Sequence, residues 1–143
     1  MEKIGILSII GIIGGFIAKA FGGWSDAMTT LIICMVADYI TGLIVAGVFR
    51  KSKKTADGGL ESRAGWKGLM RKFSTLLLVL IAVRLDMELN TDYICPCVIY
   101  GFMANECLSI VENIGLMGVP LPKIMTDAIT LLNRKGNNDV TNQ

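Results

Sequence analysis

The sequence predicts an all-α membrane protein, a bundle of about four transmembrane helices with short amphipathic helices in a basic loop and near the C-terminus. Three observations predict this class. The mean hydropathy of the 143 residues is +0.57 and only 18% of them are charged, whereas a soluble domain usually has about 25% charged residues. Four apolar segments approach the roughly 20 residues that a bilayer-crossing helix needs. Charge is distributed very unevenly along the chain.

The predicted spans cover about residues 4–21, 27–49, 73–89 and 93–113. With the segments that connect them they form a single membrane domain over residues 1–143, and they leave no room for a sizeable soluble domain. An amphipathic segment is expected at residues 123–135. A cleaved signal peptide is the alternative for the first span, because Lys3 precedes an apolar run and Ala18-Lys19-Ala20 has the small residues of a cleavage site.

The basic loop, residues 50–72, determines the expected orientation. It contains eight basic and two acidic residues and is therefore +6, while the rest of the chain is −4. Basic loops remain on the cytoplasmic side of a membrane, whereas the acidic turn that follows the third span can cross it. Four spans then place the N-terminus, the basic loop and the C-terminus in the cytoplasm.

Asp38 lies near the middle of the second span. An ionised group at the bilayer centre costs from about 2.5 to more than 10 kcal/mol, so it requires a partner or a water-lined path. Small or weakly polar residues surround Asp38 on one side of the predicted helix, and large aliphatic residues lie opposite. We therefore expect the small side to face protein and the large side to face lipid.

Arg84 is the predicted partner of Asp38. It follows Phe73 by 11 residues, or about 16 Å of helix, which places it near the midplane of a hydrocarbon core about 30 Å thick. Arg84 can also reach Glu88, one turn further on. In the alternative arrangement Arg84 extends outward to the membrane edge near Asp86.

The fourth span carries a polar wedge on one side of an otherwise apolar helix. Lipid cannot satisfy such groups, so the wedge is expected to face the bundle interior, a water-filled path or a neighbouring subunit. The more modest alternative places its last two residues in the headgroup layer. The wedge consists of Asn105, Glu106, Ser109, Glu112 and Asn113.

Small residues mark two sites of close helix packing. Gly11 and Gly15 form a small-xxx-small pair in the first span, and Gly42 and Ala46 lie one turn apart in the second. Such pairs allow another helix to approach closely. The neighbour can be a helix of the same bundle or of a second subunit, and the sequence does not distinguish these.

The end of the basic loop predicts a short amphipathic helix on the cytoplasmic leaflet. Its apolar residues share one side between basic residues, each of which contributes about 1 kcal/mol near anionic lipid. Nucleic-acid binding is the rival interpretation, but retention of positive charge in the cytoplasm already accounts for these residues. The expected lipid-surface contacts are Arg63, Trp66, Lys67, Arg71 and Lys72.

No catalytic, cofactor or metal site is predicted. The chain has no histidine, no glycine-rich phosphate loop and no serine in a nucleophile elbow, and its carboxylates are scattered over different helices. Cys95-Pro96-Cys97 lacks the spacing of a zinc or thioredoxin-like pair. An enzymatic function is therefore not expected.

Four stretches together resemble the toxin-secretion and phage-lysis holins, which are small membrane proteins of phages and bacteria. They are Asp38-Tyr39-Ile40-Thr41-Gly42, Ser62 to Lys72, Asn105 to Asn113, and Gly118 to Lys123. The resemblance covers most of the chain from Asp38 to Leu132, and it rests on the order and spacing of these four stretches. The first span matches only in being hydrophobic and rich in glycine.

The resemblance implies a homo-oligomer in the bacterial inner membrane that opens a hole, with the polar faces as lumen or subunit contacts. An endolysin or a large toxin would leave through the hole, without necessarily contacting the protein. Two other classes remain open: a four-helix proton-coupled cation exporter that uses Asp38 or Glu106, and a membrane scaffold that forms no pore. The long basic loop and the lack of an acidic residue between Ile4 and Phe21 disfavour the exporter.

Overall fold

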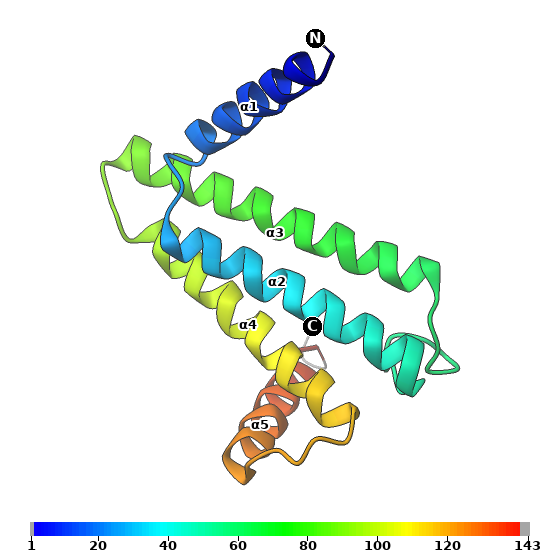
Figure 1. Cartoon of the computed structure of the whole chain (residues 1–143). Helices are drawn as coiled ribbons and strands as arrows, with labels where there is room; N and C mark the ends of the chain where they lie inside the picture. Colours follow the sequence, from blue (N-terminus) through cyan, green and yellow to red (C-terminus); the bar gives the residue numbers. More distant parts are fainter. Residues whose placement is uncertain (1, 141–143) are drawn as a thin grey trace.

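The described part of the chain is helical, with three long helices side by side (Figure 1). A computed structural model describes the backbone of residues 2–140 and the side-chain surroundings of residues 4–131. Its elements are α1 (Glu2–Ala20), α2 (Asp26–Ile44), the π-helical turn η1 (Val45–Phe49), α3 (Ser62–Leu89), α4 (Ile94–Leu116) and α5 (Lys123–Val140). The all-α prediction is confirmed for these residues.

The core lies where α2, α3 and α4 meet, with α2 and α4 packed most extensively. The buried side chains recur at intervals of three, four or seven residues, which is the spacing of a coiled-coil seam. They are Met28, Leu31, Met35 and Asp38 in α2, Val79, Val83 and Asp86 in α3, and Ile99, Glu106 and Asn113 in α4, with Ala82 also buried beside Val83. Apart from Asp86 at the α3–α4 turn, apolar residues fill one end of this seam and polar residues fill the other.

The third helix is longer than the sequence predicts. Residues 62–72 are the first part of α3, which runs without interruption for 28 residues, so the separate amphipathic helix expected in the basic loop is wrong. The apolar run begins only after Lys72, but the residues from 62 to 72 are mostly good helix formers. Helix propensity does not depend on where the membrane begins. As a consequence, the basic residues of 63–72 are fixed on the same rigid element as the buried Val79.

The faces of α2 differ in part from the expected ones. Ile33, Val36 and Ile40 point outward and are at least half exposed, as predicted. The inward face, however, contains Met28 and Leu31 as well as small residues. Large side chains fill the seam around Met28 and Leu31, because α2 and α3 are not closely packed against each other.

The first helix leaves the bundle. α1 projects away from the three-helix unit (Figure 1). Its large apolar side chains are exposed on every side; Ile4 near its start is 70% exposed and Phe16 near its end is 74% exposed. Gly22 and Gly23 allow the abrupt turn because both have positive φ, at 69° and 106°. Ser25 then begins α2 by accepting a hydrogen bond from the Met28 amide.

Within the residues that the structure describes, two segments are long and apolar enough to cross a membrane by length and composition, Asp26–Phe49 and Ile94–Leu116. Residues 4–20 form a shorter apolar helix. The outer faces of the three-helix unit carry exposed leucine, isoleucine and phenylalanine, as expected for helices surrounded by lipid. The number of spans beyond these two stays a prediction.

A polar connection at Asp86 joins the end of α3 to the start of α4. Asp86 accepts hydrogen bonds from the Thr91 hydroxyl and from the amides of Ile94 and Cys95, at 3.1 and 2.7 Å for the amides. It therefore satisfies amide donors in the first turn of α4 that have no partner within the helix. At the other end of the unit, the loop turns at Gly58, which has φ +71°.

The C-terminal helix α5 lies beside the end of α4 (Figure 1). Ile124, Met125 and Leu131 are exposed, while Ala128 and Ile129 are partly covered. An amphipathic helix was predicted over residues 123–135, and the helix extends beyond it to Val140. The side chains beyond residue 131 lie outside the described ones.

Candidate functional site

A cluster of charged and polar side chains occupies the middle of the bundle. Lys72 of α3 donates hydrogen bonds to both Asp38 of α2, at 2.8 Å, and Glu106 of α4. The three side chains are only 14%, 10% and 8% exposed. One ammonium group thus connects the three long helices.

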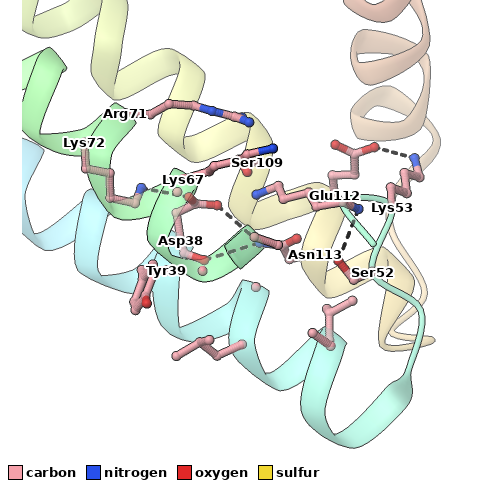
Figure 2. Close-up of a pocket in the computed structure, with 18 of the residues that line it drawn as sticks. Asp38, Tyr39, Ser52, Lys53, Lys67, Arg71, Lys72, Ser109, Glu112 and Asn113 are labelled. Atoms are coloured by element: carbon pink, nitrogen blue, oxygen red, sulfur yellow. Dashed lines mark hydrogen bonds and ion pairs between the residues drawn. The ribbon is translucent and has the colours of Figure 1, made fainter. Parts of the chain in front are cut away.

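Asn113 of α4 completes this arrangement, which we call the central cluster (Asp38, Lys72, Glu106 and Asn113). Its amide donates to the Asp38 carboxylate at 3.2 Å (Figure 2) and to the Thr41 hydroxyl at 3.0 Å. Gly42 lies beside this contact, and a Cβ atom there would make an ordinary van der Waals contact with the Asn113 nitrogen, at 3.7 Å. In the described residues no buried side-chain nitrogen or oxygen lacks a partner.

The central cluster holds the helices together at a high electrostatic cost. Transferring an ion out of water costs several kcal/mol, and attraction compensates only when the geometry is good and the remaining groups are hydrogen-bonded. Two carboxylates facing one ammonium also leave an excess negative charge. Helix separation would leave these charges without partners, which is acceptable only where water can reach them.

The predicted Asp38–Arg84 pair is wrong within this chain. Asp38 pairs with Lys72 instead, and the guanidinium of Arg84 is exposed and lies 3.8 Å from the sulfur of Met87. Arg84 also forms no ion pair with the described, exposed Glu88. Depth alone suggested Arg84, but the rotation of α3 turns it away from the seam.

Lys72 was predicted to contact the lipid surface, and this is also wrong. The sequence contained a signal for its true position, because Lys72, Leu76, Val79, Val83 and Asp86 are spaced by four, three, four and three residues. That spacing places Lys72 on the buried stripe of one continuous helix. If the end of the basic loop formed a separate surface helix, as the charge pattern predicted, this buried stripe would not extend to Lys72.

The polar wedge divides between interior and groove. Glu106 and Asn113 are buried in the central cluster, Ser109 and Glu112 are partly buried, and Asn105 is exposed. Glu112 pairs with Lys53 of the loop. The wedge therefore faces the other helices of the same chain along most of its length.

A groove of about 1030 Å³ extends from the central cluster to the loop (Figure 2). Residues of α2, α3, α4 and the segment 52–61 line it, and Ile129 of α5 reaches its edge. Lys67 and Arg71 of α3 extend into it toward Ser109 of α4 (Figure 2). Within the described residues no group of histidine, cysteine and carboxylate side chains could hold a metal ion.

The remaining predicted residues lie on outer surfaces or in the bundle. Gly11 and Gly15 have no atom within 4 Å of where a Cβ would lie, so their stripe on α1 is unoccupied in the single chain. Ala46 is buried beside the α2–α4 contact. The other expected lipid-surface residues, Arg63, Trp66, Lys67 and Arg71, are exposed.

Comparison with known proteins decides the family. A sequence model of the bacteriophage holin family matches residues 15–134. The chain belongs to the bacteriophage holin family. The match includes the central cluster and the groove, and it begins within α1.

One holin relative is a protein of Bacillus phage phi105 named a probable holin, with 33% identity over 119 residues, which is 81% of this chain and 82% of the phage protein. An uncharacterized protein of Listeria monocytogenes is 34% identical over 96% of this chain and 90% of its own length. An uncharacterized protein of Clostridium perfringens is 33% identical over 96% and 98%. No solved structure matches.

Proposed function

We propose that this membrane protein acts as a holin: it accumulates in the bacterial inner membrane, assembles into homo-oligomers and opens a hole that releases an endolysin or a large protein toxin. The observation that carries the proposal is the buried central cluster in an otherwise lipid-facing bundle. Membership of the holin family and the resemblance to a probable holin of a phage support it.

The proposed topology has four spans and places both termini in the cytoplasm. The 28 residues of α3 rise about 42 Å, close to the 40–45 Å of a bilayer with its headgroups. Its basic first part would then lie among the cytoplasmic headgroups, as positive charge in the loop requires. The exposed apolar surface of α1 is consistent with a further span that lipid or another subunit surrounds.

In the proposed mechanism the central cluster holds the closed bundle together. Lys72 joins α2, α3 and α4 at one point, so opening a polar lumen between these helices would require both of its ion pairs to break. Water entering the lumen would then solvate Asp38 and Glu106. The charges that are costly in the closed bundle would thereby favour the open assembly.

Inducible expression of the full chain in bacteria tests the proposal. A holin is expected to cause an abrupt loss of viability and passage of a folded cytoplasmic reporter protein, after a delay. An exporter that uses Asp38 or Glu106 would produce neither, and a scaffold would leave the membrane intact. Growth without reporter release, at membrane levels of the protein that cause lysis with an established holin, would refute the proposal.

The polar wedge has a separate test. Glu106→Leu and Ser109→Leu remove polarity at two positions that line the groove without shortening α4. Release of a coexpressed endolysin should be delayed or lost in both variants, because leucine removes a polar group that the water-filled hole needs, whereas Cys107→Leu, at an exposed position between them, should behave as the parent. Equal release by all three variants would show that the wedge is not needed for the hole.

A further inference from the structure

A second, apolar groove lies beside the polar one. It has a volume of about 640 Å³, runs between α3 and α4, and is lined by Leu78, Ile81, Ala82, Leu85, Ile94, Cys97, Val98, Gly101, Phe102 and Asn105. Leu78, Phe102 and Asn105 line both grooves. The two grooves are therefore adjacent, and one is polar at the loop end while the other is apolar along the bundle.

Three basic side chains of the polar groove are available to a ligand. Lys72 and Lys53 are already paired with carboxylates. Lys54, Lys67 and Arg71 also line the groove, and none of these three described residues forms an ion pair within the chain. Lys67 and Arg71 are one helical turn apart and extend toward the hydroxyl of Ser109 (Figure 2).

These groups match the chemistry of a phosphate diester. A guanidinium binds two phosphate oxygens at once, and an ammonium supplies a point charge. An anion at this end would also balance the positive loop. The adjoining apolar groove has no charged residue in its lining, so it suits a hydrocarbon chain.

We infer that the adjacent grooves bind one anionic glycerophospholipid of the surrounding leaflet. Its phosphate lies between Lys67 and Arg71, and one acyl chain lies along Leu78, Ala82 and Gly101. This inference rests on the membrane placement in the proposed function. It places these basic residues at a specific lipid site between helices. This is more than the general attraction of basic residues to an anionic membrane surface.

The site is occupied by lipid rather than by free phosphate, because its two halves are adjacent. Leu78 follows Arg71 by seven residues and Leu85 follows by seven more, or about 10 Å for each interval. A lipid whose phosphate is held at Arg71 can therefore place an acyl chain along Leu78 and Leu85. This hydrophobic path has the length of a segment of an acyl chain. Free phosphate would leave the apolar groove unfilled.

A quenching experiment on the full chain in phosphatidylcholine vesicles tests this inference. Trp24→Phe and Trp66→Phe remove both natural tryptophans. Leu78→Trp then places a single fluorophore in the groove, and Leu77→Trp places it on the neighbouring exposed residue, which lines neither groove. Phosphatidylglycerol or phosphatidylcholine with brominated acyl chains is added as the quencher.

We expect brominated phosphatidylglycerol to associate at position 78 about five- to twentyfold more strongly than phosphatidylcholine, since each basic residue contributes about fivefold. At position 77 the ratio should remain near one. Replacing Lys67 and Arg71 together by glutamine should abolish the preference at 78. The matched pair Lys51→Gln and Arg63→Gln, which removes the same charge outside the groove, should retain it.

Four results would overturn the inference. Equal preference at positions 77 and 78, or equal loss in both glutamine pairs, would indicate only diffuse attraction to the charged loop. Displacement of the lipid by inorganic phosphate at constant ionic strength would indicate an anion site. A disulfide between Gly15→Cys of one subunit and Cys97 of another, without lipid quenching at 78, would show that a second copy's α1 fills the apolar groove. None of these readouts depends on lysis, so the proposed function is tested separately.

Discussion

Replacing Lys72 by methionine should destabilise the bundle strongly, because it removes the cation while leaving both carboxylates buried. The side chains of Asp38 and Glu106 are only 10% and 8% exposed. Loss of one partner from a buried ion pair costs about 3–5 kcal/mol, and here one substitution removes the partner of two carboxylates. We therefore expect the free energy of unfolding to fall by about 3–5 kcal/mol or more.

The decisive comparison is with a neutral cluster. Combining Lys72→Met with Asp38→Leu and Glu106→Met replaces the three charged side chains by apolar ones, and such replacements of buried ion pairs are often neutral. We expect this triple variant to recover to within about 2 kcal/mol of the parent. Lys67→Met removes one exposed lysine from the same helix, and should change stability by less than about 0.5 kcal/mol.

Unfolding of the purified full chain in mixed micelles, followed by circular dichroism, measures these differences. Lysis timing after induction provides an independent readout at matched membrane levels, and Lys72→Met is expected to shorten the delay. The reasoning fails if Lys72→Met is as stable as Lys67→Met, or if the triple variant is no more stable than Lys72→Met alone.

Three further predictions concern groups that support the bundle. Asn113→Ala should lower the free energy of unfolding by about 1–3 kcal/mol, because it leaves hydrogen-bonding groups of the central cluster unsatisfied; an unchanged unfolding curve would contradict this. Asp86→Ala should cost about 0.5–2 kcal/mol through loss of the α4 cap, and exposed Glu88→Ala should have no measurable effect; equal costs would argue against capping. Gly58→Ala should speed proteolysis of the loop, since a Cβ there would lie 2.2 Å from the carbonyl oxygen of Arg50 at φ +71°; a loop as resistant as the parent's would disprove it.

Sequence patterns predicted the apolar helices well. The predicted spans 27–49 and 93–113 correspond to helical segments at 26–49 and 94–116, because an apolar run of about 20 residues is a strong helix signal. The basic stretch was harder. Charge indicated a surface helix, yet helix formation continued through Lys72 because the membrane boundary does not interrupt backbone hydrogen bonding.

The pairing within the site was predicted less well. Asp38 required a partner on energetic grounds, and the wedge residues Glu106 and Asn113 were correctly placed on one side of α4. The prediction that Arg84 is the partner of Asp38 used only the depth of Arg84 along its helix. Depth ignores rotation, and Arg84 is one residue away from the buried Val83, about 100° around the helix.

By itself the sequence determined that this chain is helical and apolar, that its charge is concentrated in one loop, and that Asp38 must be compensated. These properties follow from composition and local periodicity. Only the tertiary structure decided that Lys72 compensates Asp38 and Glu106 together, and that the basic groove lies beside the apolar one. Both depend on how three helices rotate about their axes, and that rotation is set by packing along the whole seam.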